Sequence, residues 1–161
     1  MLVLHGLGGT GESFASALGI PRLAGEKKFV YAAPDGELDS KGRRFWNASR
    51  ACCDFDHRGT DHVAALGAII EQAKRLPSVD PARVYVLGFS NGAFMAHRLA
   101  CSVPGIAAIA SVAGAGATDG DPPCAPAKPV AILEVHGDAD RAVPFEGGHV
   151  LGMMAVPAHP A

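Results

Sequence analysis

The stretch VLGFSNGAFM, Val86–Met95, contains a serine in a pattern that is typical of a catalytic nucleophile. Its G-x-S-x-G core, with Ser90 at the centre, sets a serine on a sharp turn between a strand and a helix. A serine hydroxyl attacks a carbonyl carbon only when a nearby base takes its proton, so this chemistry also requires a histidine. In a chain with 20 glycines the motif alone is a weak signal, and its surroundings have to decide.

The residues around Ser90 supply the strand and the helix that the motif needs. Residues 83–87, RVYVL, are typical of a buried strand, and residues 91–96, NGAFMA, are typical of a helix. The two motif glycines leave room for closely approaching backbone in a strained turn. At the start of the helix, the N–H of Asn91 and the local dipole point toward a developing oxyanion. We therefore predict a nucleophile turn with Ser90 at its apex.

Two further stretches follow predicted strands and could complete this chemistry. In LHGLGGTG, residues 4–11, a second oxyanion donor is expected from the backbone N–H of Leu7. A phosphate-binding loop is excluded there, because no Lys-Ser/Thr follows and the pattern is not G-x-G-x-x-G. In EVHGDADRAVPF, residues 134–145, Asp138 and Asp140 are both candidates for an acid that orients an imidazole.

Short apolar runs that alternate with helical periodicity predict an α/β fold with a mostly parallel sheet flanked by helices. Buried strands are expected at residues 2–5, 29–33, 84–87, 106–112 and 130–135. Helices are expected at residues 14–23 with an end near Pro21, at residues 63–73 with Thr60 or Asp61 as cap, and at residues 91–101. Residues 34–59 and 114–129 are predicted to be loops, because they are rich in Gly, Pro, Asp and Ser.

The composition indicates one globular domain over residues 1–161. A chain of 161 residues with 48% hydrophobic content can bury one substantial core. The net charge of −2 comes from interspersed acids and bases, so no nucleic-acid partner is expected. The longest apolar runs are far shorter than the roughly 18 residues of a membrane helix, so no membrane partner is expected either. No signal peptide is recognisable, since Leu2–Leu4 follow Met1 directly.

The cysteines favour disulfides over a metal site. They form no C-x-x-C pair and have no histidine at zinc-finger spacing, so no structural metal is predicted. Adjacent cysteines rarely bond each other, and we therefore expect Cys52 and Cys53 each to reach Cys101 or Cys124, as in an extracellular or periplasmic protein. The alternative is a reduced protein with four small buried thiols.

Residues 54–59, DFDHRG, begin like a calcium-binding loop. Arg58 stands where an oxygen ligand is needed, however, and Ala65 stands where the loop would need glutamate. The acidic residues are expected to cap the following helix and to bond local backbone instead. We predict neither a metal nor a cofactor.

Several stretches together resemble the polyhydroxybutyrate depolymerase-like esterases, which are similar to the feruloyl and acetylxylan esterases of the α/β-hydrolase fold. These stretches are VLHGLGGT, PDG, FWNAS, ACCDFD, VDPARVYVLGFSNGAFMAHRLAC, SVAGA and VHGDADRAVPFEGG. The resemblance implies Ser90 as nucleophile, Asp140 rather than Asp138 as the acid, and Trp46 and Asn47 in the substrate cleft. It also implies a secreted or periplasmic enzyme that cleaves hydroxyalkanoate esters or plant cell-wall acyl esters.

The same resemblance implies a catalytic histidine in a Gly-His loop after a further helix and strand. Only 21 residues follow Asp140, and they contain His149, in the segment GGH, and His159, in a Pro/Ala-rich tail. The residues around His149 resemble the expected Gly-His loop locally. They follow the segment of the candidate acids, residues 138–145 (the acid segment), directly, without a further helix and strand between them. The alternatives are His149 as base, a histidine from a partner subunit, or no base. We expect an α/β-hydrolase core truncated at its N-terminal strands and at its C-terminal helix and strand.

The other histidines that we consider are expected to be structural or solvated. His5 is predicted to shape the oxyanion turn, and His97 to lie on the helix after the serine as a packing or surface residue. His57 and His62 flank the start of the crossover helix and are expected to be solvated.

Two functions follow from these predictions. The first is a serine esterase that forms an acyl-enzyme on Ser90 and acts on a small-molecule or polymeric ester. The second is a catalytically inactive module that binds acyl or sugar ligands, or that forms a homodimer through exposed sheet edges. Phe89, with Phe45 and Trp46, could line an apolar cleft, although Trp46 could equally be a core aromatic residue.

Overall fold

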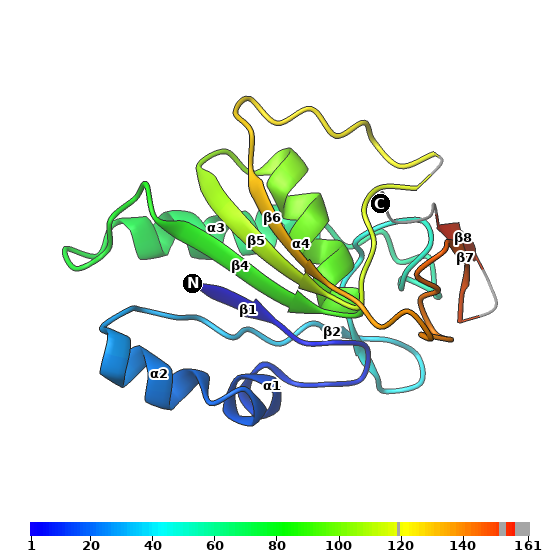
Figure 1. The fold of residues 1–161 in the computed structure, drawn as a ribbon, viewed down its shortest axis with the longest axis horizontal. Helices are drawn as coiled ribbons and strands as arrows, with labels where there is room; N and C mark the ends of the chain where they lie inside the picture. The colour runs from blue at the N-terminus through cyan, green and yellow to red at the C-terminus, as the bar shows by residue number, and fades with distance from the viewer. Residues whose placement is uncertain (119, 152–153, 157–161) are drawn as a thin grey trace.

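A four-stranded parallel sheet forms the centre of the molecule (Figure 1). In the computed structural model, residues 1–118, 120–151 and 154–156 are described. The strands follow the order β1-β4-β5-β6, and every neighbouring pair is parallel. Their bounds are Leu2–Leu4 for β1, Val84–Phe89 for β4, Ile106–Val112 for β5 and Ala131–Val135 for β6. These strands confirm the predicted α/β fold, because parallel neighbours require crossover connections such as helices.

Helices cover both faces of this sheet (Figure 1). Helices α3 (His62–Lys74) and α4 (Asn91–Ser102) share the larger core with Leu2 and Leu4 of β1. Helices α1 (Gly11–Ala17) and α2 (Ile20–Lys27) instead pack on Val3, which points to the opposite face. This alternation is what a strand period of two residues demands. No helix in the described part of the chain has the length and apolar character needed to cross a membrane.

Two local expectations require correction. The segment predicted as one helix over residues 14–23 forms two helices, because Gly19 between them takes a left-handed φ of 66°. Pro21 lies in the first turn of α2 instead of ending a helix, where its missing N–H costs no hydrogen bond. The strand predicted at residues 29–33 is reduced to one bridge between Leu2 and Ala32, in which the Ala32 carbonyl accepts the Val3 N–H and the Ala32 N–H donates to the Met1 carbonyl.

The predicted loop over residues 34–59 is mostly irregular, with a small antiparallel hairpin of β2 (Glu37–Leu38) and β3 (Arg44–Phe45). A second hairpin joins β7 (Gly148–Val150) and β8 (Met154–Val156). Residues 114–118 and 120–129 contain no helix or strand, as expected for the second loop.

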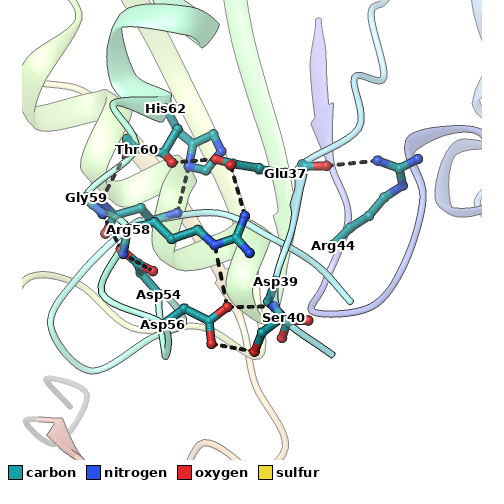
Figure 2. A network of polar contacts seen from close by, with 12 residues as sticks. Glu37, Asp39, Ser40, Arg44, Asp54, Asp56, Arg58, Gly59, Thr60 and His62 are labelled. Carbon is teal, nitrogen blue, oxygen red and sulfur yellow. Dashed lines mark hydrogen bonds and ion pairs between the residues drawn. The ribbon is translucent and has the colours of Figure 1, made fainter. Parts of the chain in front are cut away.

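A polar network holds the first loop in place (Figure 2). The Asp54 carboxylate accepts the Arg58 N–H at 2.9 Å, and the Asp56 carboxylate accepts both the N–H and the hydroxyl of Ser40, at 2.6 and 2.7 Å. The Arg58 guanidinium also lies 3.3 Å from the Glu37 carboxylate. Asp54 and Asp56 therefore bond backbone N–H groups, as predicted, but the expectation that they cap the following helix is wrong, because the side chain of Asp61 caps α3. Among the described residues, no group of His, Cys, Asp and Glu has the arrangement of a metal site.

The disulfide pairing differs from the prediction. Cys101, in the last turn of α4, is joined to Cys124, whereas Cys52 is joined to Cys53. The expectation that Cys52 and Cys53 reach the other two cysteines is therefore wrong. Both cysteines are buried and lie at a tight turn that mutual backbone hydrogen bonds between Ser49 and Cys52 close.

We predict that only the bond between Cys101 and Cys124 contributes much loop-closure stability. It spans a sequence separation of 23, so the double variant Cys101→Ala/Cys124→Ala should lose about 3 kcal/mol of unfolding free energy. The matched variant Cys52→Ala/Cys53→Ala removes a bond of separation 1, which constrains almost no loop in the unfolded chain. Urea denaturation under non-reducing conditions measures both, and equal losses would contradict the prediction.

Candidate active site

Ser90 lies at the apex of a strained turn between β4 and α4. Its φ of 50° and ψ of −120° place a non-glycine residue in a region that L-residues rarely adopt. The turn is held from both sides: the Ser90 N–H donates to the Val112 carbonyl at 2.8 Å, and the Ser90 carbonyl accepts the Ala93 N–H at 2.8 Å. The strand, turn and helix expected around this serine are all present.

The two glycines of the motif are required by close backbone contacts. A Cβ at Gly88 would overlap the carbonyl group of Gly92. A Cβ at Gly92 would overlap the carbonyl oxygens of Leu4 and His5 at the end of β1. The turn therefore packs directly against the segment that carries the predicted oxyanion donor, and no larger residue fits at either position.

Two backbone N–H groups near this turn have no acceptor among the described residues and can bind an oxyanion. Asn91 is the first residue of α4, so its N–H has no acceptor within the helix. In the turn after β1, the Gly8 N–H donates to Arg44 and the Gly9 N–H donates to Gly6, at 2.8 and 3.0 Å. The Leu7 N–H makes no hydrogen bond to any described residue. Both predicted donors are thus available.

His5 shapes this turn from the core, as predicted. Its ring is fully buried, and Nε2 accepts the Gly36 N–H at 2.9 Å. The proton of the neutral ring therefore lies on Nδ1, which donates to the Gly6 carbonyl at 2.8 Å. Burial lowers the pKa of His5, so the neutral ring that this arrangement needs is favoured.

Trp46 belongs to the core and not to a cleft. It is 2% exposed, and its indole N–H donates to the His5 carbonyl at 3.0 Å. The side chain of Asn91 holds the backbone of Trp46 twice: Oδ1 accepts the Trp46 N–H at 2.7 Å, and Nδ2 donates to the Trp46 carbonyl at 2.8 Å. A substrate has no access to a side chain buried to this degree, so the core-aromatic alternative describes Trp46.

Asn47 is half-buried and is occupied by local contacts. Its amide donates to the Thr60 carbonyl at 3.0 Å, and its backbone N–H donates to Nδ1 of His62 at 2.9 Å. His62 was expected to be solvated but is 6% exposed, with its ring edge against Phe45 and Trp46. Burial lowers the pKa of His62, which again favours a neutral ring.

Phe89 is the predicted substrate-cleft residue that stays accessible. It directly precedes Ser90 and is 41% exposed. Its ring centroid lies 5.9 Å from that of Phe14 on α1. These two rings offer an apolar surface next to the serine turn.

Of the two candidate acids, Asp140 is the one that the structure holds in place. Its Oδ1 accepts the N–H groups of Ala142 and Val143 at 2.7 and 3.0 Å, and the residue is half-buried. Asp138 is exposed and makes no side-chain hydrogen bond within the described chain. Asp140 is therefore the better-ordered of the two candidate acids.

His136, which was not among the predicted site residues, lies between β6 and Asp140. Its side chain is 1% exposed, and Nε2 lies 2.7 Å from the Val143 carbonyl and 3.6 Å from Oδ2 of Asp140. On the other side of the ring, Nδ1 lies 3.9 Å from Oε1 of Glu134. A histidine that directly follows a predicted strand, next to a candidate acid, was the signal that could have revealed it.

His149 lies on β7 and is exposed. No hydrogen bond or ion pair joins it to Ser90 or Asp140 within the part of the chain that the structure describes. The end of β7 does contact the acid segment, because the Leu151 N–H donates to the Ala142 carbonyl at 2.8 Å. The other candidate, His159, lies outside the described residues.

One cavity among the described residues is remote from this constellation. It measures about 430 Å³ and lies at the amino ends of β1 and β4, beside Tyr31, Val79 and Arg83. In parallel α/β sheets, catalytic groups gather at the carboxyl ends of the strands. Ser90, Leu7 and Asp140 all follow the carboxyl ends of strands, so we assign the candidate site to that edge.

A mostly parallel sheet covered by helices, with a serine turn and two available N–H groups at its carboxyl edge, defines the α/β-hydrolase class. Residues 1–154 match the Phospholipase/Carboxylesterase family, and the chain belongs to that family. It is therefore related to carboxylic ester hydrolases. The crystal structure of Arabidopsis thaliana SOBER1 has the same fold, with a TM-score of 0.68 at 21% identity over 90% of this chain and 76% of that one.

The relatives carry esterase names. "Putative esterase NocK" of Nocardia uniformis subsp. tsuyamanensis is 34% identical over 91% of this chain and 41% of its own length. "Feruloyl esterase B" of Piromyces equi is 28% identical over 89% of this chain and 26% of its own. A "Poly(3-hydroxyalkanoate) depolymerase C" of Paucimonas lemoignei, 30% identical over 71% and 27%, also matches, which confirms the resemblance drawn from the motifs. The chain spans less than half the length of these three relatives.

We predict that Asn91 stabilises the fold through its side chain. The substitution Asn91→Ala leaves a buried N–H and a buried carbonyl of Trp46 without partners, which should cost about 2–4 kcal/mol of unfolding free energy. The control Asn47→Ala removes one hydrogen bond from a half-buried amide and should cost about 1 kcal/mol. Urea unfolding followed by tryptophan fluorescence measures both. Similar losses for the two variants would refute the prediction.

Proposed function

We propose that the chain carries the nucleophile and oxyanion half of a serine esterase, with Ser90 forming the acyl-enzyme. One observation carries this proposal: a strained serine turn lies beside two backbone N–H groups, of Leu7 and Asn91, that lack acceptors in the described chain. Membership of the carboxylesterase family supports the same chemistry.

In the proposed reaction, the Ser90 hydroxyl attacks the ester carbonyl while a base takes its proton. The two N–H groups stabilise the negative oxygen of the tetrahedral intermediate, the alcohol leaves, and water then hydrolyses the acyl-enzyme. Asp140 orients the base and stabilises its charged form. We propose His149 as this base, because it is exposed and the end of its strand is bonded to the acid segment.

We further propose a feruloyl-type or hydroxyalkanoyl ester as substrate. The exposed ring of Phe89 and its neighbour Phe14 support an apolar acyl group. The names of the feruloyl esterase and the poly(3-hydroxyalkanoate) depolymerase among the relatives support the same two classes. An oxidising compartment, outside the cell or in the periplasm, is supported by the bond between Cys101 and Cys124.

The esterase proposal predicts turnover of p-nitrophenyl butyrate that depends on Ser90. Wild type should release p-nitrophenol and should be labelled on Ser90 by a fluorophosphonate, as mass spectrometry of the peptide would detect. Ser90→Ala should lose both, with a fall in kcat of at least about 10³-fold, because no other nucleophile takes its place. An inert wild type with an unlabelled Ser90 would refute the proposal in favour of the non-catalytic module.

The same assay tests the base. His149→Ala should lower kcat by about 10²–10⁴-fold, which is the usual contribution of a general base. His57→Ala, which removes another exposed histidine, is the matched control and should leave turnover unchanged. Equal activity of the His149 variant and wild type would remove His149 from the mechanism while leaving Ser90 as nucleophile.

We also propose that two copies of the chain associate through β6. This strand is the edge of the described sheet, and Ile132, Leu133 and Val135 are 55%, 62% and 51% exposed. An edge strand with unpaired backbone groups and apolar side chains favours pairing with a second strand. The second copy supplies such a strand by symmetry.

The dimer is tested by light scattering after size-exclusion chromatography. Wild type should elute with twice the monomer mass of 16.5 kDa at micromolar concentration. The variant Ile132→Lys/Leu133→Lys should elute as a monomer, because charged side chains at an edge oppose pairing. Leu76→Lys changes an equally apolar residue that is 45% exposed elsewhere and should leave the mass unchanged. A monomeric wild type would refute the dimer.

A further inference from the structure

A continuous set of contacts connects the serine turn to the acid segment. The Ser90 N–H donates to Val112 at the end of β5. The preceding residue on that strand, Ser111, is fully buried, and its hydroxyl donates to Oε1 of Glu134 on β6 at 3.0 Å. The two residues are also direct neighbours in the strand register. Glu134 therefore occupies a defined position between the nucleophile and the segment that follows β6.

Glu134 is also tied to the helix that follows the nucleophile. Its Oε2 lies 3.2 Å from Nε2 of His97, which is on α4 and has a side chain that is 15% exposed. The carboxylate thus joins α4, β5 and β6, and its Oε1 lies 3.9 Å from Nδ1 of His136. Nothing in the proposed reaction uses the half-buried Glu134 carboxylate directly, although it contacts three elements around the site.

His136 contacts the acid segment at two points. Since a carbonyl oxygen only accepts, Nε2 must carry the proton that is donated to Val143 at 2.7 Å. The same nitrogen lies 3.6 Å from Oδ2 of Asp140, while Oδ1 of that carboxylate accepts the Ala142 and Val143 N–H groups. The Phe145 ring, with its centroid 5.8 Å from that of His136, packs beside the imidazole. The ring thus lies among the groups that set the position of the acid.

The buried ring is poorly suited to act as the base itself. Its side chain is 1% exposed, and the Nε2–H is directed to a backbone carbonyl. A base needs a nitrogen lone pair within reach of the serine hydroxyl. A role that acts through Asp140 fits these contacts better than a direct role in proton transfer.

We propose that His136 is a positioning residue for Asp140: it holds the acid segment against the core, and Glu134 links that segment to the helix of the nucleophile. This inference rests on the proposed esterase function, since it assigns His136 to the orientation of the triad acid. A catalytic carboxylate must be placed within a fraction of an ångström, and a displacement of about 1 Å can cost about 10²-fold in rate.

The test measures kcat and KM for p-nitrophenyl butyrate in a double-mutant cycle of His136→Ala and Asp140→Ala. We expect His136→Ala to lower kcat by about 10²-fold with KM changed less than threefold, because the acid is displaced and substrate contacts are not. In the Asp140→Ala background, the same substitution should change kcat by less than threefold. A residue that acts only through Asp140 has no effect once Asp140 is absent.

His136→Gln provides the conservative variant. Its amide can place a donor near the position of the imidazole Nε2, so it should recover kcat to within about tenfold of wild type. If His136→Ala unfolds, the same double-mutant cycle is measured with His136→Leu, which fills the space without a donor, and with His136→Gln, which keeps a donor. His57→Ala again serves as the control for loss of a histidine elsewhere, with no change expected.

The outcomes separate this inference from the esterase proposal. An active wild type in which the effects of His136→Ala and Asp140→Ala multiply would overturn the positioning role and leave the esterase intact. A His136→Gln variant that is as impaired as a well-folded His136→Ala would overturn the role of the donated hydrogen bond. A wild type without turnover and without labelling of Ser90 would overturn both proposals together.

Discussion

The buried carboxamide of Asn91 is the interaction on which the site depends most. It closes two hydrogen bonds with the backbone of Trp46, whose indole in turn bonds the His5 carbonyl. Three segments that are distant in the sequence, after β1, in the first long loop and after β4, are thereby held in one arrangement. Because these groups are buried, losing any one of these hydrogen bonds would leave a polar group without a partner or water and would lower the free energy of unfolding. The side-chain amide of Asn91 thus fixes the turn after Ser90, while the backbone N–H of Asn91 remains available.

Neutral histidines extend this arrangement. His5 and His62 accept backbone N–H groups from the first long loop, of Gly36 and Asn47 respectively, so each ring needs an unprotonated nitrogen. Burial lowers the pKa of both rings and favours that state. Their contribution to stability is complete above the ordinary histidine pKa of about 6.5 and declines as pH falls below it, because the unfolded chain then binds protons that the folded chain excludes. Histidine in this fold is largely a structural residue, which explains why residue type alone was a poor guide to the base.

The candidate site combines a strained turn with backbone hydrogen bonds that hold it in place. Ser90 keeps a left-handed φ because two glycines allow backbone to pass at contact distance and because β5 binds its N–H. At the same carboxyl edge, the segment that carries Asp140 has no regular structure of its own. Oδ1 of Asp140 accepts the Ala142 and Val143 N–H groups, and the Ala142 carbonyl accepts the Leu151 N–H. The two parts of the candidate site meet at Glu134, whose carboxylate contacts both His97 on α4 and His136 beside Asp140.

The sequence by itself determined the features that depend on neighbouring residues: the turn around Ser90, helices α3 and α4, the four strands of the sheet and the backbone role of Asp54 and Asp56. Hydrophobic periodicity, helix caps and the spacing of glycines depend on residues close together in the chain, so the sequence alone reveals them. Only the tertiary structure decided that Trp46 and His62 are buried, that Cys101 pairs with Cys124, and that His136 lies beside Asp140. These facts depend on which distant segments compete for the same space, and burial and partner choice are properties of the packed molecule.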